Sequence, residues 1–368
     1  MKRVVILCVW LFSVVAGHAQ LSLDECRRLA RENYPEIRQY DLVHQTEQYN
    51  LSNAARAWIP QLAFSAQATW QTDAPNFPKE LTGMLAQQGL EIPGLRKDQY
   101  KVALELNQTI WDGGKSVADK RIARAEAAEQ KTMTDDDLYE LEGRVDDLYF
   151  GILLLDERIA QTNLTLNLLR SNLEKVRALQ RNGVAMQSDA DVLEAELLSV
   201  GQQLIQFESS CDSYRRMLGI FIGQKVGDRK LLRPSAVQPL SGESARPELA
   251  MFAAKIDRLM AQEKMVKSSS MPRLGFFAQG YYGYPGLDYM QSMMNSDWSW
   301  NAMLGVKLSW NFGAYYTQKN NLNKLRTSRQ QVEVQRDVFL FNMNLQAAQE
   351  NGDIARLRKA IADDDRIV

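Results

Sequence analysis

The sequence has few of the residues that build catalytic or metal centres. It contains only two histidines and three cysteines in 368 residues. His18 and Cys8 fall in an N-terminal leader, which leaves His44, beside Gln45 and Glu47, with no second metal ligand or nucleophile near it. We interpret His44 as a surface residue. The sequence predicts no catalytic, cofactor or metal site, and we do not expect an enzyme.

The remaining polar clusters are also poor candidates for a site. Cys26 and Cys211 stand far apart at helix-like positions without metal-type spacing, so we expect two buried, unpaired thiols. The acidic runs at 135–137 and 363–365 occupy consecutive helix positions, which point in different directions, so a solvated face is expected. Residues 189–191 lack the glycine and glutamate of a calcium loop.

Excess charge and long apolar runs are missing as well. The net charge of −1 and the pI near 6.3 leave no basic surface for nucleic acid. After the leader, no segment approaches the ~18 uninterrupted apolar residues of a membrane helix. Residues 1–19 combine a basic start, an apolar stretch and small residues before Gln20, which predicts a secretory signal peptide.

What the chain contains instead is a pattern that occurs twice. Residues 59–113 and 271–313 each read as a proline, a strand, a loop, a second strand and a tight turn into a helix. A repeat of roughly 200 residues is too long for a solenoid. It indicates a duplicated half, so we expect two structural repeats.

The predicted strands alternate between apolar and polar residues. Strands of ~10 residues with one apolar and one polar face are typical of transmembrane β-barrels, although a half-buried sheet of a soluble domain alternates in the same way. The alternation slips before Trp111. The predicted lumen residues are Lys101, Glu105, Asn107, Asn301 and Lys307.

The positions of the tryptophans favour a transmembrane β-barrel over a soluble sheet. Trp10 lies in the leader, and the other six lie at or near predicted strand ends, where amphipathic rings gather at a membrane–water interface. These membrane-interface aromatics are Trp58, Trp70, Trp111, Trp298, Trp300 and Trp310.

A long helical hairpin separates the two strand pairs. Apolar residues from Leu138 to Ile159 follow an unbroken three–four spacing, and the pattern resumes between Leu193 and Phe221. This heptad predicts an antiparallel coiled coil with its tip at residues 183–189.

The segments follow from these patterns. They are a signal peptide (1–19), N-terminal helices (20–58), strand pair one with an external loop (59–113), the helical hairpin (114–223), an equatorial linker (224–246), a helix of the second repeat (247–270), strand pair two (271–313) and a second long helix (314–368).

With these motifs in order, the chain resembles the TolC-type outer membrane efflux protein family over essentially its whole mature length. The resemblance rests on residues 23–25 and 33–37, the paired Pro60-Gln61-Leu62 and Pro272-Arg273-Leu274, the turns at 111–114 and 310–313, and the tip at 182–189. It implies a homotrimer in a bacterial outer membrane: four strands per chain in one twelve-stranded barrel, and helices forming a periplasmic tunnel. If the halves align, the second tip falls near position 382, so we read the second long helix as truncated before its return helix.

The function implied is an exit duct of a tripartite efflux or type I secretion system. An inner-membrane pump would drive transport through a periplasmic adaptor. Small residues at the tip would let the adaptor approach, although Gly183 is equally explained as a helix C-cap; the predicted contact residues are Gly183, Val184, Ala185, Ser188 and Asp189. The alternative is a periplasmic coiled-coil scaffold without a pore. The choice between drugs and peptides or proteins as cargo stays open.

Overall fold

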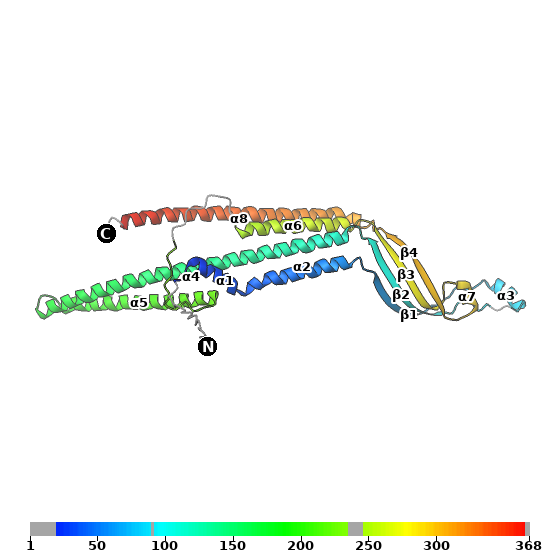
Figure 1. Ribbon diagram of the computed structural model, residues 1–368, viewed down its shortest axis with the longest axis horizontal. Coiled ribbons are helices and arrows are strands. Elements are labelled where there is room, and N and C mark those ends of the chain that lie inside the picture. Colours follow the sequence, from blue (N-terminus) through cyan, green and yellow to red (C-terminus); the bar gives the residue numbers. More distant parts are fainter. Residues whose placement is uncertain (1–19, 90–91, 235–245, 365–368) are drawn as a thin grey trace, which may run out of the picture. The chain divides into compact units, whose positions relative to one another are not determined.

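The computed structural model describes residues 20–89, 92–234 and 246–364 (Figure 1). The chain forms two compact units, one of Met1–Asp41 with Lys131–Glu248 and one of Leu42–Gln130 with Leu249–Val368. The predicted signal peptide and the centre of the predicted linker lie outside the described residues. Among the helices that are described, none has the length and apolar character needed to cross a membrane.

The first unit is helical. It contains α1 (Leu23–Asn33), the 3-10 helix η1 (Pro35–Arg38), the start of α2 (Gln39–Arg56), the later part of α4 (Lys115–Arg181) and α5 (Gln187–Ile222). Helix α1 begins at an N-cap, because the hydroxyl of Ser22 accepts a hydrogen bond from the backbone N–H of Glu25 at 3.2 Å.

The N-terminal helices expected over residues 20–58 are interrupted at Pro35. Pro35 begins a 3-10 turn in which the N–H of Gln39 bonds to the carbonyl of Glu36. Proline fits a first helical turn, where its missing N–H costs nothing. The α-helix itself runs from Gln39 to Arg56.

The predicted heptad forms the core of the first unit. Helices α4 and α5 run antiparallel, side by side (Figure 1). The fully buried side chains at their contact with α1 are Leu138, Val145, Tyr149, Ile152 and Leu218. The hydroxyl of Tyr149 lies 2.7 Å from the carbonyl oxygens of both Leu21 and Leu232, and so ties α4 to two extended segments that pair with each other. Burial raises the pKa of that hydroxyl to about 12.

Cys26 and Cys211 are buried and unpaired, as the sequence predicted. Burial, with Glu25 nearby, raises the pKa of the Cys26 thiol to about 12. Among residues 135–137, which the sequence predicts to form a solvated face, Asp135 is partly exposed and contacts two neighbouring side chains. Its carboxylate accepts a hydrogen bond from the hydroxyl of Tyr40 and lies 4.0 Å from the guanidinium of Arg31.

The second unit contains an antiparallel four-stranded sheet in the order β1-β2-β3-β4. The strands are β1 (Gln61–Trp70), β2 (Asp98–Trp111), β3 (Arg273–Tyr284) and β4 (Ser299–Ser309). The register of β2 against β3 shifts between Thr109 and Trp111, as at a β-bulge, and this is where the alternation of the sequence slips. The helical segments join the sheet at one of its ends, and the β1–β2 and β3–β4 loops lie at the opposite end (Figure 1).

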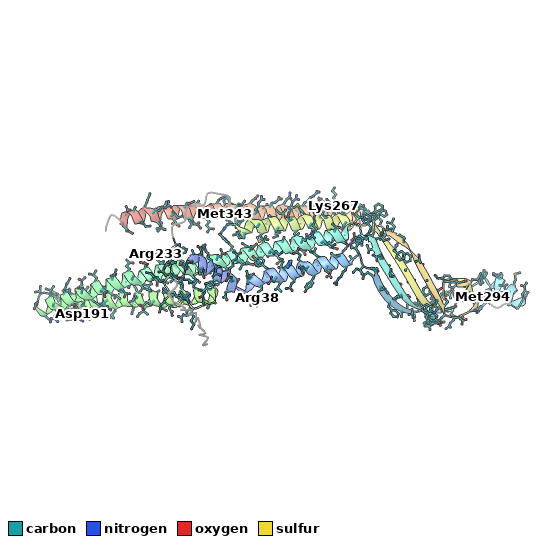
Figure 2. All side chains as sticks on the ribbon, viewed as in Figure 1. Arg38, Asp191, Arg233, Lys267, Met294 and Met343 are labelled. Carbon is teal, nitrogen blue, oxygen red and sulfur yellow. The ribbon has the colours of Figure 1, made fainter. Side chains whose placement is uncertain are left out.

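The loops carry short helices that the sequence did not predict: α3 (Lys79–Gln87) and α7 (Tyr289–Met294). Met294, the last residue of α7, lies at the loop end of the sheet (Figure 2). The two loops share a small core, since Tyr284 packs with Ala74 and Leu95. The hydroxyl of Tyr284 also accepts the backbone N–H of Arg96 at 2.9 Å and donates to the carbonyl of Ser292 at 3.1 Å.

Helices α6 (Pro247–Ser268) and α8 (Ala314–Asp364) pack together in the second unit. Phe252, Leu259 and Val332 form their buried core, and the rings of Phe252 and Phe339 lie 5.9 Å apart. Much of the rest of α8 remains exposed, including Val338, Phe341 and Leu345.

Candidate functional site

The sheet of the second unit has one exposed apolar face. Phe64 pairs with Leu104, and Ala278 pairs with Leu304, so these side chains share one side. Phe64 and Leu304 expose 73% and 74% of their surface. An apolar sheet face this exposed is unusual in a water-soluble protein.

The opposite face carries a polar network. The register places Lys101, Glu105 and Asn107 on this side of β2, and Gln279 opposite Glu105 on β3. The ammonium of Lys101 donates to the side-chain oxygen of Gln279 at 3.1 Å, and the amide nitrogen of Gln279 donates to the carboxylate of Glu105. Gln279 thus bridges a cation and an anion that stand four residues apart on one strand.

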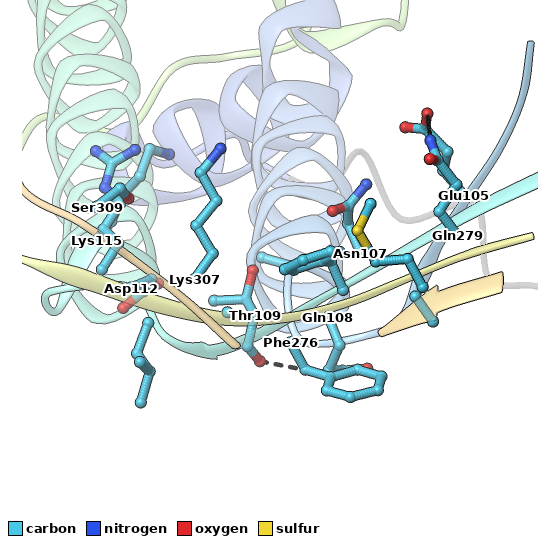
Figure 3. A pocket seen from close by; sticks show the side chains of 17 residues that line it. Glu105, Asn107, Gln108, Thr109, Asp112, Lys115, Phe276, Gln279, Lys307 and Ser309 are labelled. Atoms are coloured by element: carbon cyan, nitrogen blue, oxygen red, sulfur yellow. Dashed lines mark hydrogen bonds between the residues drawn. The ribbon is translucent and has the colours of Figure 1, made fainter. Parts of the chain in front are cut away.

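A groove of about 610 Å³ opens on the polar face, near the end of the sheet where α4 begins. Figure 3 shows Asn107 and Lys307 projecting to one side of the strands, while Phe276 projects to the other. The charged residues that line the groove are Glu105, Asp112, Lys115, Arg273 and Lys307.

The sequence-predicted lumen residues do not all meet there. Glu105, Asn107 and Lys307 line the groove. Asn301 instead holds the β3–β4 loop, because its side-chain oxygen accepts the backbone N–H of Leu287 at 2.7 Å. Arg273 and Gln279 were missed. The alternation of β3 could have found them, since both lie in phase with Tyr281.

The aromatic residues form two groups at opposite ends of the sheet. Near the loops, Trp298 lies between Tyr100 and Tyr282 with ring centroids 5.6 and 5.4 Å away, and Trp300 lies 5.0 Å from Tyr282. Trp70 ends β1 at the same end of the sheet.

At the helical end, the indole N–H of Trp310 donates to the carbonyl of Ser270 at 3.0 Å. Trp58 precedes β1, and Trp111 ends β2. All six tryptophans are exposed. Their role at a membrane interface stays a prediction.

The turn after β2 is built around Asp112, which is only 8% exposed. Its carboxylate accepts the N–H of Gly114 at 2.9 Å and the N–H of Ser116 at 2.7 Å, and also the hydroxyl of Ser116. Although burial raises the pKa of Asp112, these hydrogen bonds outweigh it and hold the pKa below its usual value. After β4, Asn311 accepts the N–H of Gly313 at 3.0 Å in the same way.

The hairpin tip closes α4 with a Schellman motif. The N–H of Val184 bonds to the carbonyl of Leu179 at 2.9 Å, and the N–H of Gly183 bonds to that of Gln180 at 2.9 Å. Gly183 has a φ of +75°, and a β-carbon there would meet nothing within 4 Å. Capping therefore accounts for Gly183 by itself.

Helix α5 begins where the carboxylate of Asp189 accepts the N–H of Met186 at 2.9 Å. Asp191 lies close to this turn (Figure 2). Val184, Ser188 and Asp189 are exposed, and Ala185 is half-buried. Adaptor contact by these residues stays a prediction.

Across residues 20–89, 92–234 and 246–364, no group of three or more histidine, cysteine or carboxylate side chains could hold a metal ion.

The fold is similar to those of outer membrane channels. The outer membrane protein VceC from Vibrio cholerae matches with a TM-score of 0.60 and 15% identity, over 87% of this chain and 75% of VceC. The outer-membrane channel OprN matches with a TM-score of 0.63 and 13% identity, over 86% and 71% of the two chains. The CmeC outer membrane channel of Campylobacter jejuni matches with a TM-score of 0.60 and 14% identity, over 87% and 68%.

No curated protein sequence matches the chain. A family model, however, gives the same assignment as the structures. The family model described as outer membrane efflux protein matches residues 27–223, which is more than half of the 368 residues. The members of this family and the proteins in these structures are channels and not enzymes. The chain belongs to the outer membrane efflux protein family and resides in the outer membrane, with helices in the periplasm.

Proposed function

We propose that the chain is the exit duct of a tripartite efflux or type I secretion system, and that three copies close one twelve-stranded barrel. The observation that carries the proposal is the four-stranded sheet with an exposed apolar face and two edges, β1 and β4, that have no partner strand in the described chain. Unpaired backbone N–H and C=O groups are too costly in lipid, so these edges must pair with other copies.

The number of strands limits the assembly. Four strands cannot close a barrel, and the smallest known membrane barrels have eight. An eight-stranded barrel is filled by its own side chains, so two copies would leave no duct. Three copies give twelve strands and a water-filled interior, with the polar face of the sheet inside.

The helices support association as well. Leu164, Leu168, Leu198 and Ile205 are exposed on the hairpin, as are Val338, Phe341 and Leu345 on α8. Apolar stripes of this kind are buried when coiled-coil helices meet partners. We infer that neighbouring copies cover part of them and that the helices line a periplasmic tunnel.

The turns support two structural repeats. Asp112 and Asn311 each accept the N–H two residues later, and each follows a strand and precedes a long helix. The hairpin tip is the proposed contact with a periplasmic adaptor, through which an inner-membrane pump would act.

The test is the mass of the detergent-purified protein, followed by its conductance in a planar bilayer. A trimer with steady conductance is expected. A water-soluble monomer or dimer without conductance would contradict the duct and favour a scaffold without a pore. The exposed faces of Phe64 and Leu304 argue against that scaffold, because a soluble cap would have to cover them.

A further inference from the structure

The groove on the polar face carries more positive charge than its surroundings neutralise. We propose that it binds anionic solutes carrying carboxylate or phosphate groups, and that it makes the duct prefer anions over cations. This inference rests on the proposed function, because it takes the polar face to be the inner wall of a duct.

Arg273 and Lys307 are the two residues that would make the contact. Lys307 lies opposite Gly275, and Arg273 lies opposite Ser309, so the two basic residues are diagonal neighbours on β3 and β4. Diagonal neighbours in a sheet stand about 7–8 Å apart. One carboxylate or phosphate group can therefore reach both side chains, and the guanidinium can bind it with two parallel hydrogen bonds.

The residues opposite them leave this space open. Gly275, opposite Lys307, has no side chain. Ser309 is small and exposed. Within the described residues, neither Arg273 nor Lys307 forms an ion pair, and both are exposed.

The other charges of the groove are already engaged. Lys115 lies 2.8 Å from the carboxylate of Asp119. Asp112 stays ionised, but its carboxylate is buried in its own turn, where it accepts from Gly114 and Ser116. Among the described residues, Arg273 and Lys307 are the exposed, unpaired charges near this end of the groove, and so they are the ones that act on a passing solute.

Glu105 is too distant to neutralise Lys307. Its partner Gln279 stands four residues along β3 from Gly275, which lies opposite Lys307. Four residues of a strand span about 13 Å, which exceeds the Debye length of ~8 Å at physiological ionic strength. In a three-copy barrel the two free cations would recur in each copy around the wall, where the low-dielectric surroundings strengthen their field.

The test is the reversal potential of single channels under a potassium chloride gradient, in a bilayer of zwitterionic lipid. We expect the wild-type channel to favour chloride and the double variant R273Q/K307Q to lose that preference. A unit charge about 8 Å away in water raises the local anion concentration by a factor of about two and lowers the local cation concentration by the same factor. Removal of both charges should therefore lower the chloride-to-potassium permeability ratio by a factor of up to about sixteen.

Two controls separate position from charge count. K79Q removes one exposed lysine from α3, outside the sheet, and should leave selectivity unchanged. R273K keeps the charge and should keep most of the chloride preference. Inorganic pyrophosphate, added to the aqueous chambers, should reduce the wild-type current more than that of R273Q/K307Q, which shows that the groove takes the anion from solution and not from lipid headgroups.

The outcomes distinguish the two proposals. A wild-type protein that is a water-soluble monomer or dimer without conductance overturns the duct and this inference with it. A conducting wild-type channel that prefers cations, or a selectivity that R273Q/K307Q leaves unchanged, overturns the anion groove and leaves the duct intact.

Discussion

A β-carbon placed on Gly113 would lie 2.7 Å from the β-carbon of Met271. Gly113 belongs to the turn between β2 and α4, and Met271 to the connection between α6 and β3. The same β-carbon would lie 3.2 Å from the backbone oxygen of Pro272. Two junctions between helix and strand, one from each half of the chain, are thus packed with no room for a side chain between them.

Replacement of Gly113 by alanine should destabilise the protein through two effects. The φ of +71° costs an L-residue ~1–2 kcal/mol, and the clash with Met271 adds to that. Gly114 is the matched control, because its φ is +85° but a β-carbon there meets nothing within 4 Å. Thermal unfolding in detergent should show a larger loss for G113A than for G114A. Equal losses would mean that the contact with Met271 does not matter.

The ionised Asp112 should stabilise the protein only above acidic pH. Its folded-state pKa is held below the unfolded value, so the contribution is present above the unfolded pKa of ~3.9 and is lost as pH falls through the folded pKa. D112N keeps an acceptor for Gly114, as Asn311 does for Gly313, but loses the charge. We expect the wild-type protein to have the higher Tm at pH 6 and the gap to D112N to shrink below pH 4. A gap that is the same at both pH values would contradict the role of the charge.

Arg215 should stabilise the first unit far more than its neighbour Arg216. Its side chain is 17% exposed, forms two hydrogen bonds with Asp156 at 2.8 and 3.0 Å, and donates to the carbonyls of Gly227 and Arg229. Loss of these contacts in R215M should cost ~2–3 kcal/mol of the free energy of unfolding.

Arg216 provides the matched control for that measurement. It pairs with Asp212 at 2.8 Å, but both side chains are mostly exposed, so R216M should cost less than ~1 kcal/mol. Urea unfolding of the two variants tests the difference. Similar losses would show that the buried contacts of Arg215 contribute little.

A charge at the hairpin tip should weaken adaptor binding without affecting the barrel. Val184 is 75% exposed, so V184E should keep the mass and conductance of the wild-type protein. Its affinity for the purified adaptor, measured by surface plasmon resonance, should fall at least tenfold. V192E, at an exposed position on α5, is the control. Unchanged affinity in V184E would remove the tip from the proposed contact.

Local patterns predicted the strands, the turns and the hairpin well. The alternation in β2 even located the register shift before Trp111, because a slip in side-chain phase and a slip in register are the same event. The heptad from Leu138 to Ile152 likewise marked the buried stripe of α4. These features depend on residues close in the chain.

Features that depend on distant pairing were not predictable. The bridge from Lys101 through Gln279 to Glu105 requires the register of strands that lie more than 170 residues apart in sequence. The contact between Arg215 and Asp156 requires the axial alignment of α4 with α5. The helices α3 and α7 were missed because the proline and glycine of these loops mask a short helix. Helix α7 in addition depends on the packing of Met293 against the cluster of Tyr284, Ala74 and Leu95.

Cross-linking between copies tests the closure of the barrel most directly. Ser65 on β1 and Met303 on β4 both lie on the polar face of the two edge strands. In a background with Cys26 and Cys211 replaced by alanine, S65C should be combined in turn with M303C, with G305C and with N301C, and then oxidised in detergent. Closure by pairing of β4 with β1 predicts covalent dimers and trimers, with the trimer as the largest species. Monomers alone at every position, or a ladder that continues beyond three, would contradict a closed trimeric barrel.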